Sequence, residues 1–437
     1  KSGTAFDLSI ALAILAAFGE FKGADISNIL FIGELSLNGE INHVDGVLSM
    51  ACLAAKEQIP IIIVPYEDLN EAALVKGVKV YGAKTLKEVS DYILKKGNLH
   101  EVIEAVQQLK EEKRDVFDQI IGQKAAKRAL MIAAAGGHHL LMIGPPGSGK
   151  TMLAKAMRSL LPEMTFDEKL EVSKIYSVAG KLKKGKYLID ERPFIAPHHT
   201  ASSASLIGGG KYAGPGAVSL ASSGVLFLDE LPEFKQEVLE TLRQPLEEHT
   251  VTVSRVNGTY TYPATFQLIS AMNPCKCGFY PDREKCSCTD MQVKRYIGRI
   301  SRPILDRIDM TIEVFPVLPD KKSSKADNDI TLAEAIEAVK GARQIQKRRF
   351  SGKSIDCNAL MENREIKQYC KVNKDGEKLL EIIIKNDGLS TRAYFKLLRL
   401  ARTIADLDKE ELIGKKHISE AYMYRRIISK YWKGDPA

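Results

Sequence analysis

The stretch GPPGSGKT at residues 144–151 constrains the fold most, because it matches the pattern G-x-x-x-x-G-K-[ST]. An apolar run precedes it and a helical pattern follows it, which is the strand–loop–helix context that this pattern requires. Backbone N–H groups of the loop and of the helix N-terminus can hold phosphates. Lys150 can reach the β- and γ-phosphates, and Thr151 can hold Mg²⁺. The sequence therefore predicts a nucleotide site made by Gly144, Pro145, Pro146, Gly147, Ser148, Gly149, Lys150, Thr151 and Met152.

Polar residues at the ends of two later strand-like runs complete this prediction. The run GVLFLDE at residues 224–230 ends in two adjacent carboxylates. We expect Asp229 beside the Mg²⁺ ion and Glu230 to polarise the attacking water. The alternative is a strand that ends in surface acids, but the phosphate loop upstream favours the catalytic interpretation. Asn273 ends the next run and can orient water or the γ-phosphate; an Asx turn before Pro274 is compatible with that role.

The order of strand-like and helical runs predicts the domains. Between residues 116 and 317, runs such as HHLLMIG and TFQLISAM alternate with helical patterns, which predicts a parallel sheet flanked by helices. Beyond the polar stretch 318–331, the periodicity is helical throughout. We predict an α/β protein with a partial N-terminal α+β domain over 1–95, a linker helix over 96–115, an α/β domain over 116–317 and an all-helical lid over 318–437.

Composition and charge narrow the class of protein. The chain is 45% hydrophobic and 27% charged, as in globular proteins. No apolar run reaches the length of a membrane helix and no signal-peptide pattern is present, which predicts a cytoplasmic protein that binds no membrane. Residues 340–437 hold 23 Lys/Arg against 13 Asp/Glu. This surplus suggests an anionic partner such as nucleic acid, although a solvated helical surface would give the same count.

Four of the seven cysteines lie in the loop MNPCKCGFYPDREKCSCTD at residues 272–290. In a reducing compartment clustered cysteines are more often metal ligands than disulfides. Gly278 and Pro281 allow the chain reversal that would bring the two pairs together, so we predict a structural, tetrahedral Zn²⁺ site. Unligated thiols, an iron–sulfur cluster and a regulatory disulfide are the alternatives. The predicted zinc ligands are Cys275, Cys277, Cys286 and Cys288.

Several longer stretches resemble a known family. RPFIAPHHTASSASLIGGG, PGAVSLASSGVLFLDELPEF and SRVNGTYTYPATFQLISAMNPC are similar to the YifB/ComM subfamily of magnesium-chelatase-like AAA+ ATPases, and the resemblance covers nearly the whole chain. It implies that the phosphate loop is the Walker A motif, LFLDE is Walker B and Asn273 is sensor 1. Arg307 matches the arginine finger, with Arg302 as the nearby alternative, and Arg392 matches sensor 2 on the lid. The family also implies a homo-oligomeric ring, usually a hexamer, because the finger acts on a neighbour's nucleotide.

Two segments resemble insertions of that branch. Residues 196–221, rich in Gly, Ser and Ala, are similar to the helix-2 insert. The segment TVTVSRVNGTYTYPA alternates around Asn257-Gly258, which predicts a hairpin, and it resembles the hairpin that points into the pore of related helicases. Arg255 and Lys211 are candidates for contacts with DNA, or else simply exposed. His198 and His199 are predicted as turn residues rather than ligands or nucleic-acid contacts.

The N-terminal segment resembles the proteolytic domain of Lon, whose fold is of the ribosomal-protein-S5-domain-2 type and whose chemistry uses a Ser-Lys dyad. Ala5 occupies the serine position and Met50 the lysine position, so neither a nucleophile nor a base is present. We predict an inactive scaffold with an unknown protein partner. Because the chain begins within an element at Lys1, without Met, we expect this domain to be truncated.

These observations predict a ring-forming motor that hydrolyses ATP and acts on DNA. The family resemblance implies branch migration of recombination intermediates in natural transformation. The alternatives are a metal-insertion motor of the magnesium-chelatase type and a protein-remodelling or regulatory ATPase. Stimulation of ATP hydrolysis by DNA would separate the DNA motor from both alternatives. The predicted catalytic residues are Lys150, Asp229, Glu230, Asn273, Arg307 and Arg392.

Overall fold

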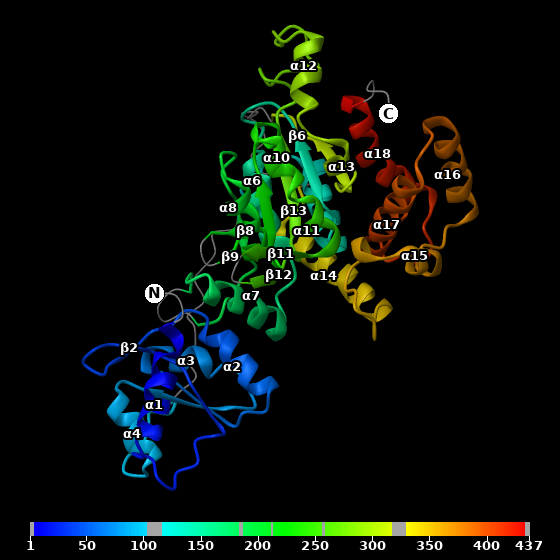
Figure 1. Cartoon of the computed structure of the whole chain (residues 1–437). Helices are drawn as coiled ribbons and strands as arrows, with labels where there is room; N and C mark the ends of the chain where they lie inside the picture. Colours follow the sequence, from blue (N-terminus) through cyan, green and yellow to red (C-terminus); the bar gives the residue numbers. More distant parts are fainter. Residues whose placement is uncertain are drawn as a thin grey trace. The chain divides into compact units, whose positions relative to one another are not determined.

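The computed structural model describes residues 4–102, 116–182, 187–210, 213–255, 258–316 and 329–432. Most of the predicted linker helix, most of the boundary at 318–331, Lys211 and Asn257 lie outside these ranges. Contacts along the chain define two compact units, which are described separately (Figure 1). The smaller unit contains Lys1–Glu112 and Met164–Glu191, and the larger unit contains Lys113–Glu163 and Arg192–Ala437.

A five-stranded parallel sheet in the order β14-β6-β13-β10-β7 forms the centre of the larger unit. Every residue of β6, β10 and β13 is buried, which explains their continuous apolar sequences. Leu140 and Met142 of β6 face one apolar cluster, while Leu141 and Ile143 face another, as the two-residue period of a strand requires. The strands are β6 (Leu140–Ile143), β7 (Phe194–Ile195), β10 (Val225–Leu228), β13 (Gln267–Met272) and β14 (Met310–Glu313).

Helices cover both faces of this sheet. On one face α5 (Lys124–Gly136) and α6 (Lys150–Leu160) contribute to the same apolar cluster as the lid. On the other face are α9 (Ala217–Leu220), the 3-10 turn η3 (Leu231–Glu233), α10 (Gln236–Glu240), α11 (Arg243–Glu248), α12 (Asp290–Ile297) and α13 (Arg302–Leu305). The predicted parallel sheet with flanking helices is therefore confirmed.

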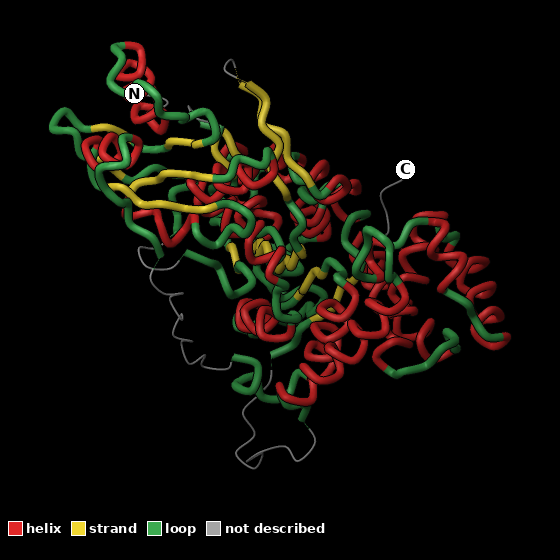
Figure 2. Tube along the Cα trace, turned by 90° about the horizontal axis from the view of Figure 1, so that it is seen from below, coloured by secondary structure: helices red, strands yellow, loops and turns green. Residues whose placement is uncertain are grey.

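Between residues 332 and 432 the lid consists of helices joined by loops and one short 3-10 turn, and it appears in Figure 2 as the red helices near the C-terminus. Thr331 caps its first helix through a reciprocal capping box with Glu334, and Ser390 caps the helix that carries Arg392. The lid elements are α14 (Leu332–Arg349), η4 (Asn358–Leu360), α15 (Asn363–Tyr369), α16 (Lys374–Asp387), α17 (Thr391–Leu407) and α18 (Lys415–Trp432).

Two small antiparallel hairpins lie beside each other in the larger unit (Figure 1). Strands β11 (Thr250–Arg255) and β12 (Gly258–Pro263) form the hairpin that alternation predicted, with Arg255 opposite Gly258. Tyr262 donates a hydrogen bond of 2.9 Å to the carbonyl oxygen of Ala213 in the glycine-rich insert. That insert contains α8 (Ser203–Ile207), β8 (Gly208–Gly209) and β9 (Gly214–Pro215).

The smaller unit is built around a three-stranded parallel sheet in the order β1-β4-β5. Ala5 and Met50, at the two positions of the Lon-type dyad, both pack against the same apolar cluster, which contains residues of α2 and β4. The elements are η1 (Thr4–Phe6), α1 (Asp7–Ala17), β1 (Ile29–Phe31), β2 (Glu34–Leu35), β3 (Ile41–Asn42), α2 (Val47–Lys56), β4 (Ile61–Pro65), η2 (Tyr66–Asp68), α3 (Leu69–Ala72), β5 (Lys79–Ala83), α4 (Leu86–Ile93) and α7 (Phe166–Val178).

Helix α7 belongs to the smaller unit, so its predicted place in the 116–317 domain is wrong. It packs against α2, and the hydroxyl of Ser177 donates a hydrogen bond of 2.6 Å to the buried carboxylate of Glu71. The same carboxylate accepts the backbone N–H of Leu48. The chain thus returns to the smaller unit between α6 and β7.

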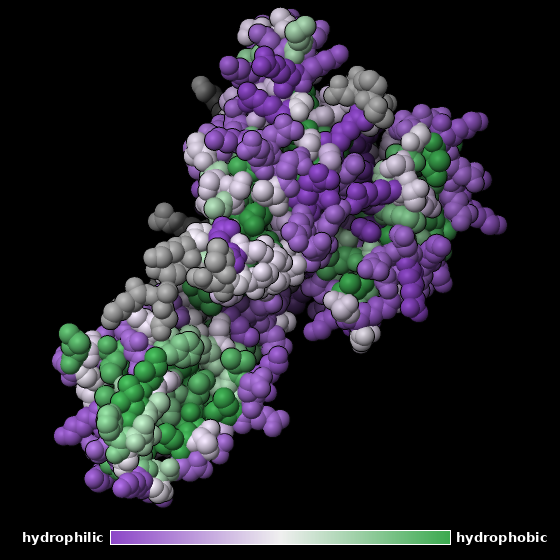
Figure 3. Space-filling model, in the orientation of Figure 1, coloured by the Kyte–Doolittle hydropathy of each residue, from purple (hydrophilic) through white to green (hydrophobic). Residues whose placement is uncertain are grey.

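Apolar side chains gather on the visible face of the smaller unit in Figure 3. Ile10, Ile14 and Phe18 in or next to α1 are all at least half exposed. In the part of the chain that the structure describes, no helix is both long and apolar enough to cross a bilayer.

Candidate nucleotide site and cysteine cluster

The phosphate loop links the buried end of β6 to the first turn of α6. Gly147 and Gly149 have φ angles of 75° and 87°, a region that glycine enters at low cost. A Cβ atom on Gly144 would overlap the carbonyl oxygen of Val314, so a larger residue does not fit there. The ammonium group of Lys150 donates hydrogen bonds to the carbonyl oxygens of Gly144 at 2.7 Å and Pro145 at 2.9 Å. The shape of the loop therefore depends on its glycines and on the hydrogen bonds of Lys150.

A cavity of about 420 Å³ brings together most of the residues that the sequence predicted for nucleotide binding. The Thr151 hydroxyl donates to Asp229 at 2.8 Å, and Lys150 donates to the side-chain oxygen of Asn273 at 3.2 Å. These groups lie at the carboxyl ends of β6, β10 and β13, where parallel α/β sheets bind their ligands. The cavity is lined by Pro146, Gly147, Ser148, Gly149, Lys150, Thr151, Met152, Asp229, Glu230, Met272 and Asn273.

The electrostatics of this cavity suit an anionic ligand bound with a cation. Burial lowers the pKa of Lys150, and the carboxylates of Asp229 and Glu230 oppose that change. A lysine and two carboxylates within one cavity provide separate places for phosphate oxygens and for Mg²⁺, which prefers oxygen ligands. Thr151 and Asp229, which are joined by a hydrogen bond, could hold such an ion.

Glu230 has a positive φ angle, and its side chain lies next to a histidine that the sequence did not predict there. Its φ angle is 51°, uncommon for a residue with a side chain and frequent at functional sites. Nδ1 of His199 lies 3.4 Å from Oε2 of Glu230. Strand β7 pairs in parallel with β10, so the residues following the two strands are brought together. His199, predicted as a turn residue, therefore lies beside the candidate catalytic carboxylate.

Arg307 and Arg392 do not line the cavity. Both lie instead against the carboxylate of Glu247. Glu247 lies 2.6 Å from a guanidinium nitrogen of Arg307 and 2.5 Å from one of Arg392. The side chain of Arg307 is 8% exposed and also donates to the carbonyl oxygens of Pro303 and Arg243, whereas that of Arg392 is 57% exposed. Burial raises the pKa of Glu247, but hydrogen bonds from the two guanidiniums more than offset this and lower it. No sequence pattern indicated Glu247.

A buried ion pair fixes the lid helix that carries Arg392 relative to the segment that carries Arg307. Asp309, two residues after Arg307, lies 2.8 Å from the ammonium group of Lys396, one turn after Arg392. Burial would raise the pKa of Asp309, but the Lys396 charge holds it well below its usual value. The two arginines are thus held in one place by the fold.

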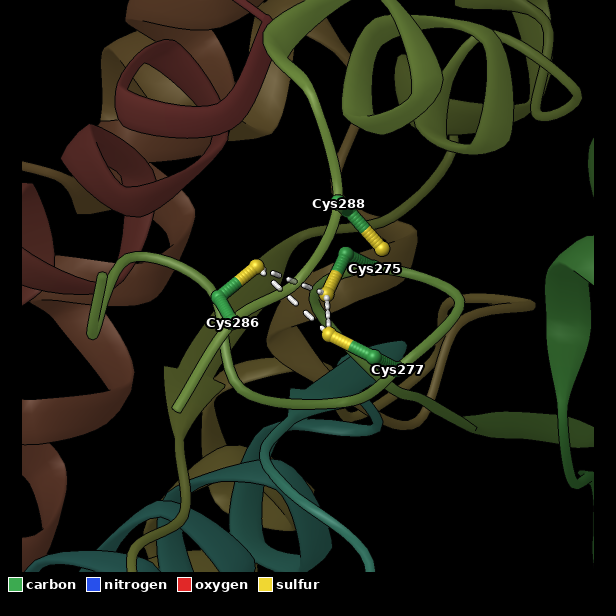
Figure 4. Close-up of side chains that lie close together, drawn as sticks. All are labelled: Cys275, Cys277, Cys286 and Cys288. Carbon is green, nitrogen blue, oxygen red and sulfur yellow. Dashed lines mark hydrogen bonds between the residues drawn. The ribbon is translucent and has the colours of Figure 1, made fainter. Parts of the chain in front are cut away.

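The four loop cysteines converge, as Figure 4 shows. Their sulfur atoms all lie within 4.8 Å of one another, with Cys275 3.3 Å from Cys277 and 3.7 Å from Cys286. A tetrahedral Zn²⁺ with Zn–S bonds of about 2.3 Å separates its sulfurs by about 3.8 Å, so the cluster fits such an ion with small adjustments. Burial raises the pKa of Cys277, but hydrogen bonds with the Phe279 backbone and with Cys275 lower it to about 6. A thiolate is the form that binds metal.

The basic candidate of the hairpin lies next to the glycine-rich insert. The guanidinium of Arg255 donates to the carbonyl oxygen of Gly210 at 3.3 Å, and Arg255 is exposed. Tyr260, on the other strand, is 44% exposed. A cation and an aromatic ring therefore lie near the end of the hairpin, while Lys211 lies outside the described residues.

A parallel sheet with a phosphate loop, an acidic strand end, an asparagine on the next strand and a helical lid defines an AAA+ protein of the P-loop class. Family models extend this assignment along the chain. "Magnesium chelatase, subunit ChlI" matches residues 116–322, its C-terminal model matches 331–425, and "Subunit ChlI of Mg-chelatase" matches 1–68. The chain belongs to this magnesium-chelatase-like AAA+ family and, within it, to the YifB/ComM subfamily.

Individual relatives support the same assignment. The chain is 42% identical to Competence protein ComM of Haemophilus influenzae over 434 residues, which is 98% of this chain and 84% of that protein. It is 39% identical to Uncharacterized protein YifB of Escherichia coli over 427 residues, 98% of this chain and 83% of that protein. A match of 55 residues at 49% identity to Archaeal Lon protease of Halobacterium salinarum, 13% of this chain and 8% of that protein, agrees with the Lon-like resemblance.

Proposed function

We propose that the protein is a ring-forming motor that hydrolyses ATP with Mg²⁺ and acts on DNA. The observation that carries this proposal is the convergence of Lys150, Thr151, Asp229, Glu230 and Asn273 on one cavity. Lys150 would neutralise phosphate charge, Thr151 and Asp229 would hold Mg²⁺, Glu230 would polarise the attacking water, and Asn273 would orient it. The Mg²⁺ ion would neutralise charge on the phosphate oxygens.

The positions of the two arginines support assembly into a ring, and the family leads us to expect a hexamer. Arg307 and Arg392 lie together on Glu247 and not in the cavity of their own chain. An arginine stabilises the transition state of phosphoryl transfer only when it reaches the transferred phosphate. We therefore propose that Arg307 acts as the finger, and Arg392 beside it, on the nucleotide of a neighbouring subunit.

Three features support DNA as the substrate. A relative that shares 42% identity over nearly the whole chain is named Competence protein ComM. Arg255 and Tyr260 place a cation and a ring near the end of a hairpin, a combination that suits phosphates and bases. The lid region carries the positive surplus of the chain. Branch migration of recombination intermediates is the specific activity we propose.

We expect forked DNA to raise the ATP hydrolysis rate several-fold, and Arg255→Ala to reduce that stimulation without changing the rate in the absence of DNA. The reason is that Arg255 lies away from the nucleotide cavity but at the hairpin. Steady-state ATPase assays with and without DNA check this, with Arg364→Ala, an exposed arginine of α15, as the control. If DNA leaves the parental rate unchanged, the DNA assignment is wrong, and the metal-insertion or protein-remodelling alternative gains support.

We propose that the cysteine cluster holds one structural Zn²⁺ and expect about one zinc per purified chain. Cys277→Ser should lose most of the metal, because a hydroxyl is a poor substitute for a thiolate. Metal content by elemental analysis, on protein purified under reducing conditions without chelators, checks this; Cys52→Ser, a change outside the cluster, is the control. Iron with acid-labile sulfide would instead identify a cluster, and absence of any metal would leave unligated thiols.

The smaller unit is proposed as an inactive scaffold that binds a protein partner. Ala5 and Met50 supply packing and no reactive group. We also propose a cytoplasmic location.

A further inference from the structure

The cysteine loop contacts the nucleotide site at two points. The loop begins at Asn273, whose side-chain oxygen accepts a hydrogen bond from Lys150, and Cys275 follows two residues later. Gly278, directly after Cys277, has a φ angle of 91°. A Cβ atom on Gly278 would overlap Cδ of Pro146 and lie 2.9 Å from its Cγ. The backbone of the loop therefore lies directly against the phosphate loop.

The other side of the same loop lies against the lid. The ring of Tyr280 lies 6.3 Å from the ring of Tyr431 in α18, measured between centroids. The hydroxyl of Tyr431 donates to Glu313 at the end of β14 at 2.6 Å. The backbone N–H of Tyr280 in turn donates to the sulfur of Cys275 at 3.4 Å. One short segment thus links the thiol cluster, the lid and the phosphate loop.

Turn hydrogen bonds, the contact of Tyr280 with Tyr431 and the thiol cluster hold this loop, and the thiol cluster joins its two cysteine pairs. Between β13 and α12 the described chain forms turns without helix or strand, and all five residues from 281 to 285 are exposed. A segment that buries few apolar groups opens at low free-energy cost. Crosslinking of the two cysteine pairs by a metal would remove that freedom and hold Gly278 at Pro146.

We propose that metal at the cysteine cluster and nucleotide at the phosphate loop bind with positive coupling, transmitted by the contact between Gly278 and Pro146. This inference rests on the proposed ATP and zinc sites and adds that each ligand strengthens binding of the other. Linkage requires reciprocity: the factor by which zinc tightens ATP binding equals the factor by which ATP tightens zinc binding. Couplings of this kind typically correspond to about 5- to 150-fold changes in affinity.

The first test measures both sides of the coupling in the full chain. Dissociation constants for Mg·ATP are determined with zinc-loaded and zinc-depleted protein, and zinc affinity is determined by competition with a chromogenic chelator with and without Mg·ATP. We expect zinc to tighten Mg·ATP binding at least fivefold, and Mg·ATP to tighten zinc binding by the same factor. In the Lys150→Ala chain, Mg·ATP should no longer protect the zinc, which separates the effect from direct chelation of zinc by ATP. Equal affinities with and without the other ligand would overturn the coupling.

The second test breaks the contact without touching a metal ligand. Gly278→Ala should keep one zinc per chain but bind Mg·ATP at least fivefold more weakly, because the new methyl group overlaps Pro146. The double variant Gly278→Ala/Pro146→Ala, which removes Cγ and Cδ, should recover part of that affinity, a non-additive result expected of residues in contact. Gly341→Ala in α14, where nothing lies within 4 Å of the new methyl group, is the control.

The outcomes separate this inference from the function on which it rests. If the parental chain binds zinc and ATP but independently, or if Gly278→Ala binds Mg·ATP normally, the coupling is wrong while the proposed sites stand. If zinc-loaded parental chain fails to bind Mg·ATP, the proposed ATPase function itself is wrong. If Gly278→Ala fails to fold, the ATP and zinc affinities of the parental chain still show whether the two sites are coupled.

Discussion

Replacing Glu230 with glutamine should slow ATP hydrolysis by about 10²-fold or more while leaving ATP binding nearly unchanged. Glutamine keeps the size and shape of the side chain but carries no negative charge to polarise water. Glu230 and Lys150 both line the cavity, and we propose that Lys150 binds the phosphates while Glu230 acts in the chemical step, so the loss should fall on kcat. Single-turnover hydrolysis and a nucleotide dissociation constant, measured on the same preparation, check this prediction.

Two further variants serve as controls for Glu230→Gln. Glu233→Gln, on the same segment but directed to Arg299 at 3.0 Å and not at the cavity, should hydrolyse ATP at the parental rate. Lys150→Ala should instead lose nucleotide binding, because its ammonium group is the cation beside the phosphate loop. A Glu230→Gln chain that turns over ATP at the parental rate would remove Glu230 from the proposed mechanism.

Arg307→Ala should abolish hydrolysis, with a loss of about 10³- to 10⁵-fold, yet leave ATP binding nearly intact. Arg307 is held at Glu247 together with Arg392, outside the cavity of its own chain, and we propose that it acts on the nucleotide of a neighbouring subunit. Mixing Arg307→Ala with Lys150→Ala chains should therefore restore activity. In mixed rings, some interfaces combine an intact phosphate loop with an intact arginine, whereas each variant alone forms none.

The mixing experiment also controls for folding. Arg307 is buried and donates to two backbone carbonyls, so its removal could disturb the segment between α13 and β14. Restored activity in the mixture requires that the Arg307→Ala chain folds, binds ATP and assembles. A mixture that stays inactive although mixed rings form would assign the finger to Arg302 or require every interface to be intact. Full activity of Arg307→Ala alone would show that the proposed action of Arg307 on a neighbour's nucleotide is wrong.

The sequence by itself determined the elements whose chemistry is local. The phosphate loop was predictable because its glycines, its lysine and the first residues of α6 all lie within eight consecutive residues. The hairpin of β11 and β12 followed from alternation around Asn257-Gly258, and the thiol cluster followed from four cysteines in one short loop. In each case the partners are close in sequence, so spacing alone constrains their geometry.

The tertiary structure alone decided which distant residues meet. The strand order β14-β6-β13-β10-β7 places His199 beside Glu230, and packing of the lid brings Arg392 to Arg307 on Glu247. The return of α7 to the smaller unit and the contact between Gly278 and Pro146 also join parts that are distant in the sequence. Hydrophobic period reports which face of an element is buried, but not against which element, because that choice depends on the packing of the whole chain.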